Sequence, residues 1–152
     1  MQSELLQIAR ELATRKGGSP HWVSRNRAIS AAYYALFHAL AELCARELVG
    51  AWKPWPAFRH VYRSLDHAAA RRTFEAARSR GGFSAGLIAI GDLFRLLQKE
   101  RHAADYDPGY RVSRAEVLDR IERTVDVLQR LGELPLDERK LLAARLIGRT
   151  RS

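Results

Sequence analysis

The stretch SRNRAISAAYYALFHALAELC, Ser24 to Cys44, decides the fold of this chain. Its apolar residues recur at the spacing that places side chains on one face of an α-helix. The resulting apolar face is broad enough to be the centre of a helical core. It comprises Ile29, Tyr33, Leu36, Phe37, Leu40, Leu43 and Cys44. We expect a long helix that Ser24 caps, that continues to about Leu48 and that Gly50 ends.

Helical periodicity also occupies the sequence on both sides of this stretch. A first helix is expected from about Ser3 to Arg15, ended by Gly17-Gly18-Ser19-Pro20, and a proline- and tryptophan-rich loop from Ala51 to Phe58. No alternating pattern typical of strands competes. The later helices are expected around Val61–Leu65, after the N-cap Asp66, from Ser84 to about Ala104, from the capping box at Ser113 to Gly132, and from Leu136 to Ile147. The fold class is therefore all-α, an up-down bundle of four main helices plus short extra helices.

The charge of the chain points to an anionic partner. The 152 residues carry a formal net charge of +9, and residues 50–83 hold seven basic side chains against two acidic ones. A basic C-terminal helix or tail, residues 133–152, follows a bundle of residues 1–132. Clustered basic side chains attract phosphate backbones without reading base sequence, so RNA or a nucleotide is the expected ligand. An arginine-rich composition without any function is the alternative.

Several classes of protein lack sequence support. There is no phosphate-binding GxxxxGK[ST] loop and no GxGxxG element. One cysteine and five scattered histidines show no metal-ligand spacing, so we expect no metal and no cofactor. Cys44 is expected to pack as a small apolar side chain. No apolar run is long enough for a membrane span, and a cytoplasmic protein without membrane contact is expected.

Two segments together resemble the HEPN family of small helical domains. The first is Ser24–Cys44, with YYALFHA at its centre, and the second is LLQKERHAADYDP, Leu96–Pro108. The resemblance covers about residues 3–130. It implies a helical bundle that commonly forms a homodimer, and either a nucleotidyltransferase partner or ribonuclease activity of the toxin–antitoxin type. In the ribonuclease branch it implies a composite, metal-independent site at the dimer cleft, where the RNA 2′-hydroxyl attacks the adjacent phosphate.

The ribonuclease branch has an arginine and a histidine separated by four to six residues. If that arginine is Arg101, the histidine falls within Tyr106–Pro108, where there is none. A second register pairs Arg95 with His102, which face the same side of a helix. Histidine would move protons and arginine would stabilise the phosphorane charge. Arg95 and His102 are thus the catalytic candidates.

The remaining candidates are binding residues, and each has a structural alternative. In the structural alternative, Arg101 and Asp105, which stand four positions apart, form an ion pair. Asp105 and Tyr106 then tie the loop to the bundle. The candidates for contacts to RNA or nucleotide are Arg101, Asp105, Tyr106, Arg25, Arg27, Tyr34 and His38. Their alternatives are solvated arginines, a hydrogen-bonded structural histidine and, for Tyr33, Tyr34 and Phe37, a place in the core or dimer interface. Trp52 and Trp55 either close the bundle, which we favour, or stack on a base.

Two hypotheses about function follow. The first is a HEPN-like RNA-binding protein that acts as a homodimer, with metal-independent endoribonuclease activity of toxin type if Arg95 and His102 cooperate. The second is a non-catalytic HEPN-like module that docks on a nucleotidyltransferase or binds a nucleotide. The clustered positive charge favours the first, and the missing histidine after Arg101 favours the second.

Overall fold

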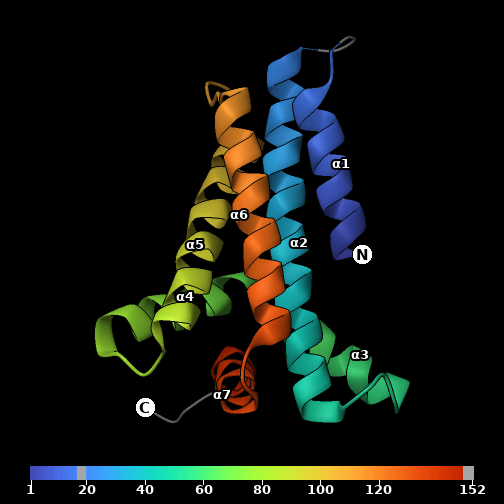
Figure 1. Ribbon diagram of the computed structural model, residues 1–152, viewed down its shortest axis with the longest axis vertical. Helices are drawn as coiled ribbons and strands as arrows, with labels where there is room; N and C mark the ends of the chain where they lie inside the picture. Colours follow the sequence, from blue (N-terminus) through green and yellow to red (C-terminus); the bar gives the residue numbers. More distant parts are fainter. Residues whose placement is uncertain (17–19, 149–152) are drawn as a thin grey trace. The chain divides into compact units, whose positions relative to one another are not determined.

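The computed structural model describes residues 1–16 and 20–148, and in these residues it contains helices and no strand (Figure 1). The expectation of an all-α fold is confirmed. The helices are α1 (Gln2–Thr14), α2 (His21–Val49), α3 (Trp55–Ser64), α4 (His67–Arg80), α5 (Ala85–Tyr106), α6 (Arg114–Glu133) and α7 (Leu136–Ile147). Gly17-Gly18-Ser19, expected to end the first helix, lies outside the described residues, as do Arg149 and Arg151 of the basic tail.

The chain divides into two compact units. Unit 1 comprises Met1–Leu36 and Leu93–Gln129, and unit 2 comprises Phe37–Asp92 and Arg130–Ser152. The long helices α2, α5 and α6 each contribute residues to both units. The sequence predicts a different division, between a bundle of residues 1–132 and a C-terminal helix or tail of residues 133–152. That division stays a prediction.

Unit 1 is built on small side chains that let three helices approach closely. Ala9 and Ala28 are fully buried, and Ile29, Val117 and Ile121 fill the space around them. These residues come from α1, α2 and α6, so one apolar face of each helix is removed from water. Figure 1 shows α1 and α6 on either side of the first half of α2. The apolar pattern that begins with Ser24 therefore forms the centre of this unit.

Unit 2 contains the short helices. Helix α4 contacts α7, where Leu142 and Leu146 are buried. Phe74 of α4 lies against Gly91 of α5 so closely that a Cβ at that glycine would collide with the ring. Cys44 is buried in this unit, and burial raises the pKa of its thiol to about 12, so it packs as the expected small apolar side chain.

Local signals account for most helix ends. The Asp66 side chain accepts a hydrogen bond from the Ala69 amide at 2.8 Å, and Gly50 follows α2 with φ 102°. Two expectations are wrong. Helix α2 begins at His21, so Ser24 lies inside it and is no N-cap. The expected loop to Phe58 ends at Pro54, because Pro56 occupies the first turn of α3, where proline costs no hydrogen bond.

Helix α2 is long and apolar enough to cross a membrane by length and composition, and it is the only such helix among the described residues. In its most apolar window 61% of the residues are buried inside the protein. A core helix passes the same test, so this finding is weak evidence for a membrane span. The expected absence of membrane contact stays a prediction.

Candidate functional site

The two segments that carry the family resemblance meet in unit 1. The guanidinium carbon of Arg101 lies 5.5 Å from the centre of the Tyr33 ring and 5.2 Å from that of Tyr34. Arg101 Nε donates to Asp105 Oδ2 at 3.1 Å, and Ser30 Oγ donates to Asp105 Oδ1 at 3.1 Å. The Arg101 cluster, defined as Ser30, Tyr33, Tyr34, Arg101 and Asp105, therefore joins α2 to α5. Its cation is held by a carboxylate and two rings, which agrees with the structural alternative.

Tyr33 belongs to the core of unit 1. Its ring is fully buried and lies 5.5 Å from the Phe94 ring, and Gln98 Nε2 donates to its hydroxyl at 3.3 Å. A buried ring cannot stack on a base, whereas the neighbouring Tyr34 ring is half-buried. The core alternative therefore describes Tyr33, and binding by Tyr34 stays a prediction.

The structure does not join the two catalytic candidates. Both lie on α5, where Arg95 is half-buried and His102 is exposed. The contact that the structure gives His102 leads to Tyr106, with 4.8 Å between ring centres, and not to Arg95. Tyr106 is the last residue of α5 and is 69% exposed. Seven positions on a helix separate the two candidates by about 10 Å, so they share a phosphodiester only if Arg95 extends toward it.

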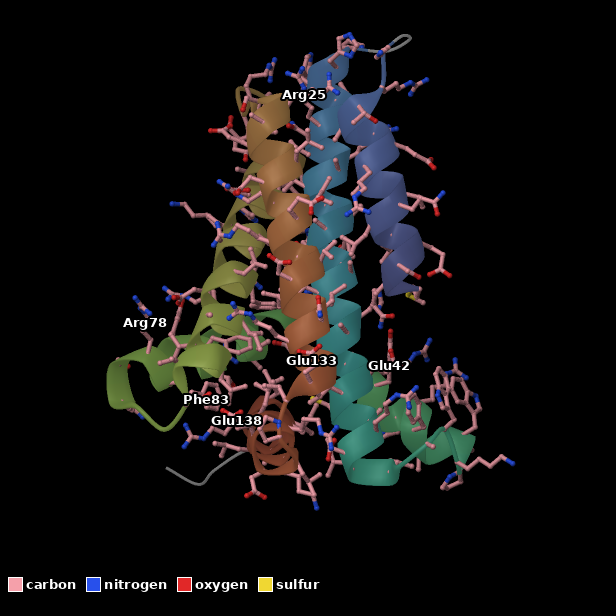
Figure 2. All side chains as sticks on the ribbon, viewed as in Figure 1. Arg25, Glu42, Arg78, Phe83, Glu133 and Glu138 are labelled. Carbon is pink, nitrogen blue, oxygen red and sulfur yellow. The ribbon has the colours of Figure 1, made fainter. Side chains whose placement is uncertain are left out.

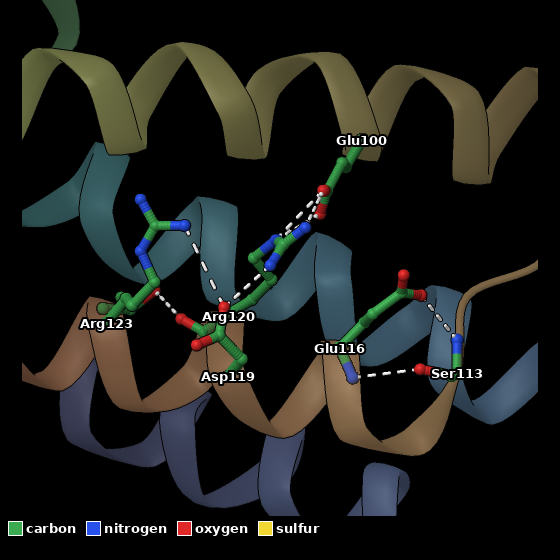
Figure 3. A network of polar contacts seen from close by, with 7 residues as sticks. Glu100, Ser113, Glu116, Asp119, Arg120 and Arg123 are labelled. Carbon is green, nitrogen blue, oxygen red and sulfur yellow. Dashed lines mark hydrogen bonds and ion pairs between the residues drawn. The ribbon is translucent and has the colours of Figure 1, made fainter.

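A second arginine of unit 1 is also occupied. Arg120 of α6 makes three hydrogen bonds to the carboxylate of Glu100 on α5, at 2.8 to 3.1 Å, and one to Asp119 at 2.7 Å (Figure 3). The Arg120 and Glu100 side chains are 19% and 13% exposed. Hydrogen bonding to Glu100 raises the pKa of Arg120 above its ordinary value. This pair stabilises the contact between α5 and α6.

His38 has a partner in unit 2. Its Nδ1 lies 2.7 Å from the Tyr62 hydroxyl, and both side chains are half-buried. Burial lowers the pKa of His38 and raises that of Tyr62, so both groups favour their neutral forms. This geometry agrees with a structural histidine, and a role of His38 in binding stays a prediction.

The cationic pocket is the feature of unit 1 that can receive an anion. It has a volume of about 260 Å³ and is lined by Ala13, Arg15, Lys16, His21, Arg25 and Arg114. Figure 1 shows why these residues meet: α1 ends where α2 and α6 begin. Figure 2 shows Arg25 at this end of the unit. Four of the lining side chains are arginine or lysine, one is histidine, and none is acidic.

The electrostatics of the cationic pocket differ from those of the Arg101 cluster. Within residues 1–16 and 20–148, the structure gives no ion pair to Arg15, Lys16, Arg25 or Arg114. The first turn of α2 has no acidic residue. In α6 the first-turn Glu116 is bound to the backbone amide of Ser113 at 2.9 Å, within the predicted capping box. Two helix N-termini add their positive ends, so an anion is favoured there.

Sequence reasoning found only part of this pocket. Arg25 and Arg27 were both candidates for phosphate contacts. Arg25 lines the pocket, whereas Arg27, two positions further along α2, is exposed and does not line it. The other lining residues were missed, although two signals pointed to them. Arg114 directly follows the capping serine, and Arg15 and Lys16 directly follow the end of the first helix. Only packing shows that these ends coincide.

The described residues contain no group of three or more histidine, cysteine, aspartate or glutamate side chains that could hold a metal ion. No protein-family model, no curated protein and no solved structure matches this chain.

Proposed function

We propose that this chain is a HEPN-like helical domain that binds RNA through its phosphate backbone and acts as a homodimer. The observation that carries the proposal is the cationic pocket, which four arginine or lysine side chains line and no acidic side chain does. The likeness to the HEPN family is supported by the contact between its two motif segments, which Arg101 makes with Tyr33 and Tyr34.

Phosphate is the anion that fits this pocket best. Arginine presents a planar set of N–H donors that matches phosphate oxygens, and unpaired cations lose no partner when they bind. A volume of about 260 Å³ is smaller than the ~300–1,000 Å³ of typical ligand pockets, so it suits a phosphate and its sugar better than a whole nucleotide. Backbone binding of this kind is salt-dependent and indifferent to base sequence.

Binding without cleavage is favoured by the state of the arginines on α5. Arg101 is engaged by Asp105, and the described contacts of His102 do not lead to Arg95. Metal-independent cleavage of RNA needs a group that transfers protons and a cation that stabilises the phosphorane at one phosphodiester, and in this proposal these are His102 and Arg95. Cleavage therefore remains a second step that Arg95 and His102 would perform if RNA drew them together.

The binding test compares two double variants with a fluorescein-labelled 20-nucleotide RNA. Arg25→Glu with Arg114→Glu reverses two charges in the cationic pocket and is expected to raise the Kd roughly 30-fold. Arg130→Glu with Lys140→Glu makes the same change in net charge on exposed residues of unit 2 and is expected to raise the Kd less than about 3-fold. Equal effects of the two pairs would assign binding to net charge alone, and no binding by the unmodified protein would end the proposal.

The cleavage test uses the same RNA in the presence of EDTA. Cleavage by this chain is expected to survive chelation, because general acid–base chemistry needs no metal. It is expected to be lost in His102→Ala and in Arg95→Ala. Cleavage that persists in both variants would reject these catalytic residues, whereas binding without cleavage agrees with the non-catalytic form of the domain.

The partner predictions are tested separately. Sedimentation velocity is expected to show a homodimer in the absence of RNA. A nucleotidyltransferase encoded beside this chain would be the partner to mix with it, and a complex would support the docking module of the second hypothesis. A monomer at all concentrations would reject the homodimer.

A further inference from the structure

We infer that a plate of three aromatic rings in unit 2 stacks on the bases of single-stranded RNA. The inference rests on the proposed RNA binding and names its substrate class. The aromatic plate comprises Trp52, Trp55 and Phe58, whose rings are parallel to within 17°, with centres 4.6 to 5.9 Å apart. Phe58 is buried, but Trp52 and Trp55 are 46% and 51% exposed. The tryptophans thus cover Phe58, as bundle closure requires, and still present ring surface to solvent.

The backbone at Trp52 is strained. Its φ is 66°, in the left-handed region that bulky side chains rarely adopt, and it is the only non-glycine residue with positive φ among the described residues. Such conformations persist where surrounding structure imposes them, and they concentrate at functional sites. Burial does not explain this one, because nearly half of the Trp52 side chain remains in solvent. In this conformation the Trp52 ring lies parallel to the Trp55 ring, within 12°.

The positive charge around the aromatic plate favours an anionic ligand. Residues 50–65 contain three basic side chains and no acidic one. Arg59 and Arg63 follow Trp55 at successive four-residue steps of α3, so all three lie along one face of the helix, and all are exposed. The Arg46 guanidinium lies 5.7 Å from the Trp52 ring centre, but it is paired with Glu42 at 2.9 Å, so the cations that remain for a ligand are Lys53, Arg59 and Arg63. Aromatic rings beside a row of cations are the arrangement that binds single-stranded nucleic acid.

The same features argue against a second copy of this chain as the occupant. Two copies of the aromatic plate face to face would bring Lys53, Arg59 and Arg63 near their equivalents, and like charges oppose such contact. Duplex RNA is also a poor occupant, because its bases are already stacked and its edges are recessed. Unpaired bases satisfy both the apolar ring surface and the surrounding cations.

The test compares binding of a 12-nucleotide single-stranded RNA with binding of an abasic oligomer of the same length and charge. The unmodified protein is expected to bind the base-bearing strand at least about 10-fold more tightly, since each stacked base contributes roughly 1–3 kcal/mol. Trp52→Gly with Trp55→Ala is expected to remove this preference, and glycine suits the positive φ of position 52. Trp52→Phe with Trp55→Phe is expected to keep most of it.

Leu136→Ala is the matched control, because it removes an exposed apolar side chain of the same unit, 51% exposed, without touching an aromatic ring. It is expected to leave the preference unchanged. Thermal unfolding of each variant confirms that the fold is intact. Equal affinity of the unmodified protein for both oligomers would overturn the inference while leaving backbone binding in place. Loss of self-association in Trp52→Gly with Trp55→Ala, with RNA preference unchanged, would also overturn it and assign the plate to a second copy.

Discussion

The Arg101 cluster and the cationic pocket lie in the same unit and are built from the same residue type, yet they differ in what holds their charge. Arg101 is bound by Asp105 and two tyrosine rings. Arg25 and Arg114 line a pocket without an acidic residue. A cation that already has a carboxylate stabilises the fold, whereas a cation without one attracts an anion from solution. The difference lies in the neighbours that packing supplies.

Other basic residues of the chain also have partners inside the protein. In unit 2, Arg78 pairs with Asp92 at 3.0 Å, and Arg139 of the basic tail pairs with Glu47 at 3.1 Å. Arg145 lies over the Phe83 ring at 5.1 Å from its centre. Part of the net charge of +9 is therefore spread over pairs inside the protein. Net charge predicts that an anion binds, but it does not predict where.

The largest expected effect is on stability and concerns Arg120, whose side chain is 19% exposed. Glu100→Gln removes the carboxylate that accepts three hydrogen bonds from Arg120, leaves the guanidinium with the more exposed Asp119, and is expected to lower the free energy of unfolding by about 2 kcal/mol, since charge-assisted hydrogen bonds of a partly buried pair are lost. Asp119→Asn removes the other, 52% exposed partner of Arg120 and is expected to cost less than about 1 kcal/mol. Urea unfolding measures both. Equal losses would mean that burial does not distinguish the two carboxylates.

A smaller effect tests the two arginine environments directly. Arg101→Gln is expected to lower the free energy of unfolding by about 1.5 kcal/mol, because it removes an ion pair and two cation–ring contacts. Arg25→Gln is expected to change stability by less than about 0.5 kcal/mol and to weaken RNA binding about 5-fold. Fluorescence anisotropy and thermal unfolding separate these outcomes. If Arg101→Gln weakens RNA binding as much as Arg25→Gln does, the two arginines do not differ in their availability to an anion.

A third prediction concerns salt. The slope of log Kd against log salt concentration for single-stranded RNA falls by about 0.7 for each phosphate that the protein no longer neutralises. Replacing two pocket arginines, Arg25→Gln with Arg114→Gln, is therefore expected to reduce the slope by roughly 1.4. Arg101→Gln is expected to leave it unchanged, since Asp105 already neutralises that arginine. A pocket variant with an unchanged slope would show that these arginines do not bind phosphate.

The smallest effect is a pH dependence in unit 2. Because burial lowers the pKa of His38 in the folded state, the unfolded chain binds a proton more readily than the folded chain. The stabilisation by neutral His38 is complete above its ordinary pKa of about 6.5 and is lost as pH falls through the lower, folded value. The difference in melting temperature between the unmodified protein and His38→Gln is therefore expected to shrink between pH 8 and pH 5. A difference that grows toward pH 5 would contradict the sign of the shift.

Sequence reasoning located the helices because their signals are local. The capping box of Ser113 and Glu116 and the N-cap Asp66 act within one turn, and both are confirmed. The errors have local causes too. Ser24 has the chemistry of an N-cap, but the chain is already helical three residues earlier, and Trp55-Pro56 looks like a loop although proline is accepted in a first helical turn.

The candidate site was only partly predictable. The pair Arg101–Asp105 could be anticipated, because residues four apart on a helix are neighbours. Arg120 and Glu100 are 20 residues apart on different helices, and no pattern in the sequence joins them. The strained Trp52 likewise carries no sequence signal, since its backbone is imposed by surrounding structure.

By itself the sequence determined that this chain is helical, where most of its helices end, and that it carries excess positive charge. Helix periodicity and capping depend on residues a few positions apart, and net charge depends on composition alone. Tertiary structure alone decided which arginines meet a carboxylate and which line a pocket with Arg25. The physical reason is that the energy of a charge depends on the groups within a few ångströms of it, and packing brings those groups from distant parts of the chain.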